Sequence, residues 1–133
     1  MQRAFKREFD SLEDVFAFIQ EFFARESIEL KYLYSMILAA EELFTNMVKY
    51  NPGNSNEIVV AVCRVDDELR LSLTDFDVDA FDLTKVSAAP PSGPLKNRKR
   101  GGWGLCLVRQ MTDAITYDYE NRQSRITVTK KLR

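Results

Sequence analysis

Three polar side chains on one predicted helix, Glu42, Asn46 and Lys49, have the types and spacing of a phosphate and cation site. Separations of four and three residues place them on one helical face. The Asn46 amide oxygen can complete a Mg²⁺ shell shared with phosphates, and the Lys49 ammonium can neutralise phosphate charge. The Glu42 carboxylate can accept a proton from an attacking hydroxyl. The same spacing is also typical of the solvent-facing side of an amphipathic helix.

A second candidate is Asp75, which follows a predicted strand at residues 69–74 in the run Asp75-Phe76-Asp77. An ionised Asp at a strand end can accept hydrogen bonds from an exocyclic amine. This favours adenine over guanine, because guanine has a carbonyl at that position. An Asp at a strand end is also a common turn residue, and the sequence leaves both interpretations open.

A third candidate is the run Arg100-Gly101-Gly102-Trp103-Gly104-Leu105, which opens a predicted helix. Glycines let the backbone approach an anion closely, and the free N–H groups and dipole at a helix start favour phosphate. The basic residues at 96–100 supply counter-charge. The alternatives are a flexible glycine hinge and, for the basic run, a solvated or partner-docking loop.

The composition excludes several kinds of site. The 133 residues include no histidine, which excludes a Ser/His/Asp triad, a Cys/His dyad, a His-ligated zinc site and a phosphohistidine carrier. A net charge of -1 argues against direct contact with nucleic acid or an anionic membrane. No apolar stretch reaches about 18 residues, and the charged N-terminus is unlike a signal peptide. Cys63 and Cys106 each lie in an apolar run, which indicates buried reduced thiols and a cytoplasmic protein.

Hydrophobic periodicity predicts the elements that position these groups. An edge strand is expected at residues 3–9, followed by a helix from residue 12 with Ser11 as its N-cap and Asp14 three residues on. A second helix is expected at residues 30–50 and ends at 51–53. Its predicted buried stripe consists of Leu33, Ile37, Ala40, Leu43, Phe44, Met47 and Val48.

The remaining pattern predicts two hairpins and a lid. Residues 58–65 are apolar on both faces and are expected in the sheet interior, paired with the strand at 69–74. Residues 77–100 lack periodicity, so a lid is expected at about 79–100 unless an element has been missed. The glycine helix is expected to end near residue 111, before a closing hairpin at 115–119 and 126–128. This order predicts one domain over residues 1–133, an α/β two-layer sandwich with a mostly antiparallel, mixed sheet covered on one face by helices.

In this order, the motifs resemble those of the GHKL ATPase superfamily, and within it the bacterial anti-sigma-factor serine/threonine kinases. Residues 42–50, Glu-Leu-Phe-Thr-Asn-Met-Val-Lys-Tyr, are similar to the superfamily's N box. Asp75-Phe76-Asp77 stands where its first glycine box belongs, and residues 101–111 resemble its second. The resemblance implies the Bergerat ATP-binding fold, with ATP and Mg²⁺ as cofactors.

The resemblance also implies a role for each matched residue. Glu42 would be the general base, Asn46 the Mg²⁺ ligand and Lys49 a phosphate contact, while Asp75 would read the adenine amine. The backbone N–H groups offered to phosphates would be those of Gly101, Gly102, Gly104 and Leu105. Arg100 would stabilise the γ-phosphate as it leaves. Asp77 replaces the glycine of the family's first glycine box, and a carboxylate there is expected to crowd the base or repel phosphate.

The implied function is that of a bacterial regulatory kinase. It would phosphorylate a serine or threonine of a STAS-domain anti-anti-sigma partner and sequester a sigma factor or similar target. The alternative is a non-catalytic protein-binding module of the same fold with weak or absent nucleotide binding. The strand at residues 3–9 and the aromatic helix after it either complete the core or form a homodimer interface.

Overall fold

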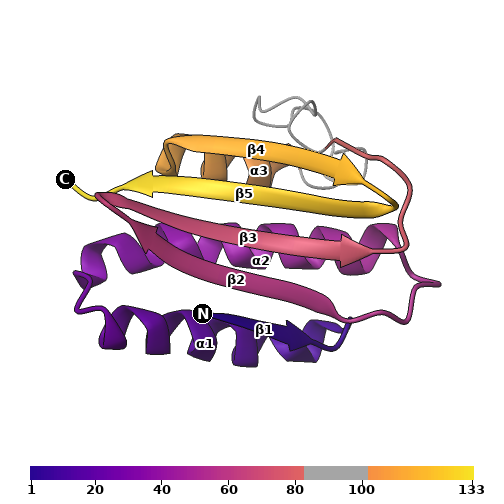
Figure 1. Ribbon diagram of the computed structural model, residues 1–133, viewed down its shortest axis with the longest axis horizontal. Coiled ribbons are helices and arrows are strands. Elements are labelled where there is room, and N and C mark those ends of the chain that lie inside the picture. The colour runs from indigo at the N-terminus through magenta and orange to yellow at the C-terminus, as the bar shows by residue number, and fades with distance from the viewer. Residues whose placement is uncertain (83–101) are drawn as a thin grey trace.

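The computed structural model describes residues 1–82 and 102–133. Its strands form one five-stranded sheet in the order β1-β2-β3-β5-β4, and every described pair is antiparallel. The strands are β1 (Gln2–Phe5), β2 (Ile58–Val65), β3 (Glu68–Phe76), β4 (Ala114–Glu120) and β5 (Gln123–Lys131). The helices are α1 (Leu12–Arg25), α2 (Leu33–Tyr50) and α3 (Gly102–Met111). All three cover the same face of the sheet, which confirms the predicted two-layer sandwich (Figure 1).

The core lies between the helices and the covered face of the sheet. Alternate strand residues point into it, so β2 buries every second side chain from Ile58 to Val62, and β3 does so from Leu69 to Leu73. The fully enclosed strand residues include Ile58, Val60, Leu69, Leu71, Leu73 and Val128. β2 is an interior strand, bonded to β1 and β3, but it is not buried on both faces as predicted. Cys63 is exposed on its outer face, whereas Cys106 is buried, so only one of the two thiols predicted to be buried is so.

Helix α2 buries a wider arc than its predicted stripe. Ala40, Leu43, Phe44 and Met47 are buried as expected, while Leu33, Ile37 and Val48 are only partly buried. The additional buried residues are Ser35, Met36, Ala39 and Asn46. The arc is wide because α2 packs against the sheet on one side and against both α1 and α3 on its flanks.

The N-terminal segment differs most from its prediction. The strand ends at Phe5 rather than at residue 9, and a 3₁₀ turn at Phe9–Ser11 leads into α1. Ser11 stands at the predicted N-cap position of α1, but its side chain makes no capping bond, because its backbone is already helical and its Oγ donates to the Lys6 carbonyl at 2.8 Å. This early turn places Arg7 between β1 and α1, where its side chain reaches Asp75 near the end of β3.

The closing elements agree with the sequence pattern. α3 and the hairpin of β4 and β5 lie where predicted, and the hairpin turn residues Asn121 and Arg122 have φ values of 53° and 60°. The predicted lid lies mostly outside the described residues, as do Arg100 and Gly101; residues 79–82 are described. Among the described helices, none is long and apolar enough to cross a membrane.

Candidate functional site

A cavity of about 310 Å³ lies beside the C-terminal half of α2. The last turns of α2, the end of β3, the start of β5 and the segment at residues 78–81 enclose it. Its described lining residues are Leu43, Asn46, Met47, Tyr50, Asn51, Asp75, Val78, Asp79, Ala80, Phe81, Ser124 and Ile126. Two predicted site residues, Asn46 and Asp75, therefore meet in one small, largely apolar cavity, of the size and character of a ligand site.

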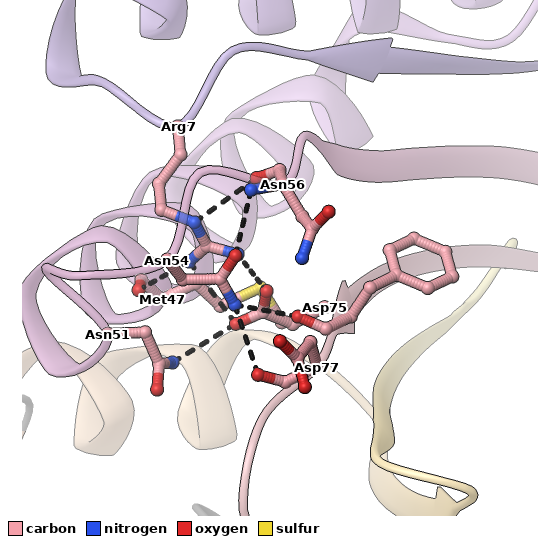
Figure 2. Close-up of polar contacts among 8 residues, drawn as sticks. Arg7, Met47, Asn51, Asn54, Asn56, Asp75 and Asp77 are labelled. Atoms are coloured by element: carbon pink, nitrogen blue, oxygen red, sulfur yellow. Dashed lines mark hydrogen bonds and ion pairs between the residues drawn. The ribbon is translucent and has the colours of Figure 1, made fainter.

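Asp75 is the buried carboxylate of this cavity. It lies within β3 opposite Ser124, one residue before the strand ends, and only 1% of it is exposed. Asn51 Nδ2 donates to Asp75 Oδ2 at 3.1 Å. The second partner is Arg7, which contacts both carboxylate oxygens and forms an ion pair with Oδ1. Figure 2 shows Asn51 and Arg7 converging on Asp75 from the end of α2 and from the loop after β1. Asp75 is thus a strand residue and not a turn residue.

Arg7 and Asn51 were not singled out from the sequence. Asn51 lies at the C-cap of α2, and its position beside Pro52 indicates only a helix stop. Arg7 is 68 residues from Asp75 in the chain. Because local periodicity carries no information about contacts at that separation, no local signal could have identified Arg7.

Asn46 and Glu42 form a hydrogen-bonded pair on α2. Asn46 is 4% exposed, and its Nδ2 donates to Glu42 Oε1 at 3.1 Å. The amide oxygen, the atom able to bind a cation, takes no part in this bond. Asn46 is buried and Glu42 is half-buried, so only the Lys49 end of this face is exposed to solvent. Among the described residues there is no cluster of acidic or Cys side chains able to hold a metal alone, so a cation here would need ligands from a bound molecule.

Burial raises the pKa of the Glu42 carboxyl group above its ordinary value of 4.5, because desolvation disfavours the charged form. The hydrogen bond from Asn46 and the charge of Lys49 act in the opposite direction but are weaker. Lys49 is exposed and lines a shallow depression on the other side of α2, next to Arg7. The structure therefore brings Glu42, Asn46 and Asp75 together and leaves Lys49 at the margin.

The first turn of α3 packs directly against Glu42. A Cβ atom added to Gly104 would lie 2.0 Å from Glu42 Oε2 and 2.2 Å from its Cδ. A larger residue at this position would require the carboxylate end of Glu42 to move away. The next residue, Leu105, is fully buried and anchors the helix in the core. Gly102 begins α3, so the described part of the glycine run is a helix start beside Glu42 and Asn46.

Asp77 does not crowd the cavity. Its φ of 57° is the left-handed conformation that glycine favours and that Asp tolerates. Its carboxylate turns outward to Arg122 Nε at 2.9 Å, with 71% of the side chain exposed. The described lining residues of the cavity do not include Asp77. The expected crowding of a bound base therefore does not arise from the Asp77 side chain.

The segment after Asp77 is fixed to the closing hairpin. Val78 N–H donates to the Arg122 carbonyl at 3.1 Å, and Tyr119 Oη donates to the Val78 carbonyl at 2.7 Å. Phe81 N–H donates to Tyr117 Oη at 3.0 Å. The Phe81 ring then lies 5.4 Å from the ring of Tyr50 across the rim of the cavity. These bonds hold one wall of the cavity on β4 and β5.

Known proteins resemble this chain in sequence or in fold. The serine/threonine-protein kinase BtrW of Bordetella bronchiseptica is 24% identical over 118 residues, which cover 87% of this chain and 82% of BtrW. The RsbU and RsbW domains of Rv1364c from Mycobacterium tuberculosis give a TM-score of 0.71 at 17% identity, over 99% of this chain and 32% of that chain. A chain of the SiaB–SiaC complex from Pseudomonas aeruginosa gives a TM-score of 0.65 at 14% identity, over 98% of this chain and 87% of that chain. Our chain therefore spans about a third of the mycobacterial chain, and both structures show that the fold is shared.

The histidine kinase-like ATPase domain family matches residues 5–130 of this chain. The match begins at the last residue of β1 and includes the whole of α2, β3 and the described glycine helix, and so every described residue that lines the cavity. It confirms the resemblance to the GHKL superfamily drawn from the residues at 42–50, 75–77 and 101–111. The chain belongs to the histidine kinase-like ATPase domain family.

Proposed function

We propose that this protein is a bacterial serine/threonine protein kinase that binds Mg-ATP in the cavity lined by Asn46 and Asp75. The observation that carries the proposal is the meeting of these two residues, 29 positions apart, in one small cavity with Glu42 hydrogen-bonded to Asn46. Family membership supports the use of ATP, and BtrW supports the class of reaction.

The cavity suits the base of the nucleotide. Leu43, Met47, Val78 and Ile126 supply apolar walls for a flat ring, and Asp75 supplies an acceptor for its exocyclic amine. The phosphates would then extend toward the start of α3, where the N–H groups of Gly102, Gly104 and Leu105 would meet them. The family resemblance adds Gly101 and Arg100, which lie outside the described residues, and Lys49, which the structure leaves at the margin of the site. The Asn46 amide oxygen would complete the Mg²⁺ shell.

Glu42 is the residue we assign to the proton transfer. When bound, Mg-ATP supplies the phosphoryl group and the cation that neutralises its charge. The Glu42 carboxylate accepts the proton of the attacking serine or threonine hydroxyl, and its raised pKa makes it a stronger base than an exposed glutamate. Asn46 holds one of its oxygens, so the other is presented toward the start of α3.

The partner we propose is a STAS-domain anti-anti-sigma protein, with a sigma factor or equivalent target sequestered by the same chain. The resemblance of residues 42–50 and 101–111 to anti-sigma kinases supports this choice. The likeness to the RsbU and RsbW domains and to a chain of the SiaB–SiaC complex is consistent with a regulatory role.

The test is phosphoryl transfer with purified components. We expect label from γ-labelled ATP on one serine or threonine of a STAS protein encoded in the same genome, located by mass spectrometry. Glu42→Gln is expected to bind nucleotide and lose transfer, and Asp75→Asn to weaken nucleotide binding strongly. Absence of transfer to every STAS protein of that genome would contradict the kinase assignment.

A non-catalytic binding module is the second candidate. The close packing of the Glu42 carboxylate against Gly104 favours it, because this contact occupies the space between α2 and α3. Calorimetry separates the two functions. Heat on adding Mg-ATP that is lost in Asn46→Ala and Asp75→Ala supports the nucleotide site, and no heat with the unaltered protein supports the module.

A further inference from the structure

Arg7 lies behind the base-binding carboxylate, on the side away from the cavity. Asp75 lines the cavity, whereas the described lining residues do not include Arg7. Arg7 instead borders the separate depression that contains Lys49 and Asn54. Its side chain is 4% exposed and that of Asp75 is 2% exposed. The two charges are thus enclosed together, with Asp75 between the guanidinium and the space for a ligand.

The guanidinium of Arg7 uses donors on all three nitrogens. Nη1 donates to the Met47 carbonyl at 2.9 Å and to Asp75 Oδ2 at 3.3 Å, while Nη2 contacts Asp75 Oδ1. Nε donates to the Asn56 carbonyl at 3.2 Å. Because the planar guanidinium of Arg7 is hydrogen-bonded to four acceptors, its orientation is fixed. The Asp75 carboxylate, bonded through both oxygens, is fixed as well. Figure 2 shows Arg7 joining the end of α2, the loop before β2 and the end of β3.

We propose that Arg7 is the positioning residue that makes the cavity selective for a base with an exocyclic amine. Paired on both oxygens, Asp75 is held as an acceptor, with its remaining lone pairs aimed by Arg7 and Asn51. An amine hydrogen of the base satisfies such an acceptor. A carbonyl at the same position places two acceptors against each other in a buried site, which is strongly unfavourable. The inference rests on the proposed function, because it assumes that a purine nucleotide occupies the cavity.

The test compares two nucleotides that differ at this position. Inosine diphosphate carries a carbonyl where adenosine diphosphate carries the amine, and the two have the same phosphates. Affinities of both, with Mg²⁺, are measured for the unaltered protein and for Arg7→Lys, which keeps the charge but cannot grip both oxygens. We expect Arg7→Lys to weaken ADP binding about tenfold and to change IDP binding by less than about twofold. If Arg7→Lys leaves the ratio of the ADP and IDP affinities unchanged, the proposal is overturned.

A double variant shows whether Arg7 acts through Asp75. In the Asp75→Asn background, replacing Arg7 with Lys should leave the ADP-to-IDP ratio unchanged, since the two residues are coupled. A ratio that still changes would mean that Arg7 acts by another route. Arg3→Lys is the matched control, because Arg3 is an exposed arginine of β1 whose guanidinium lies 5.2 Å from the Phe5 ring centroid. It should alter neither affinity.

A measurement on the unaltered protein covers the case in which Arg7 variants do not fold. The Nε–H of Arg7 is expected to stay protected from solvent exchange when ADP binds, as seen by nitrogen-15 NMR of the side chain. Release of that N–H on binding would show that the nucleotide competes with Arg7 and would overturn the proposal. Failure of the unaltered protein to bind ADP at all is a different result, because it removes the proposed function itself.

Discussion

Glu42 is the titratable side chain at which burial and hydrogen bonding oppose each other. Its pKa is raised in the folded protein, chiefly by desolvation. Ionisation of Glu42 is therefore easier in the unfolded chain, and the charged carboxylate costs stability once the pH exceeds its folded pKa. That cost is absent below the ordinary value of 4.5, where both states are protonated.

We predict that Glu42→Gln is more stable than the unaltered protein at pH 8 and equally stable near pH 4. Glutamine still accepts the hydrogen bond from Asn46 but carries no charge to desolvate. Thermal unfolding across this pH range measures the difference. Glu41→Gln, at the exposed neighbouring position, is the control and should show no such trend. A Glu42→Gln protein that is less stable at pH 8 would mean that burial is not the dominant effect.

Gly104 is the residue that lets α3 approach the Glu42 carboxylate. We predict that Gly104→Ala keeps the fold and slows phosphoryl transfer by about tenfold or more, an effect of ~1.4 kcal/mol on the barrier. The new methyl group requires Glu42 to swing away, because the atoms in its path are the far end of a flexible side chain. The Asn46 bond to Glu42 is then lost.

The Gly104 prediction is checked by transfer rate and melting temperature together. Gly53→Ala is the matched control, because a Cβ at Gly53 meets no described atom within 4 Å. It should leave both quantities nearly unchanged. A Gly104→Ala protein with a full transfer rate would show that Glu42 need not occupy the position seen here.

Among the elements, the β4–β5 hairpin supports the cavity wall at residues 78–81, which follows β3 in the chain, through hydrogen bonds to Val78 and Phe81. The ion pairs of Arg122 with Asp77 and Asp79 lie in solvent, with more than half of each side chain exposed, so they contribute little. The bond from Tyr119 Oη to the Val78 carbonyl is partly buried and contributes more.

We therefore predict that Tyr119→Phe weakens ADP binding severalfold, because the wall loses its anchor, while Arg122→Gln changes it by less than about twofold. Titration calorimetry measures both. Tyr34→Phe, which alters an exposed tyrosine in the first turn of α2, should have no effect. A larger loss in Arg122→Gln than in Tyr119→Phe would mean that the exposed ion pairs hold the wall.

The elements themselves were largely predictable, because each has an apolar period that its own residues display. The hairpins at 58–76 and 114–131 and the helices at 12–25, 33–50 and 102–111 follow such patterns. The predictions that failed concern single side chains whose surroundings the local pattern does not specify. Ser11 bonds backward to Lys6 rather than capping α1, and Cys63 lies on the outer face because only one side of β2 is covered by helices. Of the cavity, Asn46 and Asp75 were predicted, and the partners that orient Asp75 were not.

At the scale of the whole molecule, the cavity is assembled from segments that are distant in the chain. Its lining and supporting residues extend from Arg7 to Ile126, and they belong to or flank β1, α2, β3 and β5. Strand order explains this meeting: β3 lies between β2 and β5, and α2 crosses behind it (Figure 1). Most of the cavity is therefore walled by elements of the core, and the segment at residues 78–81 is the exception.

We predict from this that nucleotide stabilises the entire domain rather than one loop. Unfolding by urea should remain a single transition, and Mg-ADP at 100 times its Kd should raise the free energy of unfolding by about 2.7 kcal/mol. Exchange of backbone amide hydrogens should slow together in β1, α2 and β3, because the Arg7 guanidinium bonds to both Met47 and Asp75. Asp75→Asn should greatly reduce the shift at the same nucleotide concentration. Protection limited to residues 77–81, or a second transition on adding nucleotide, would show that the cavity is a local feature that the core does not support.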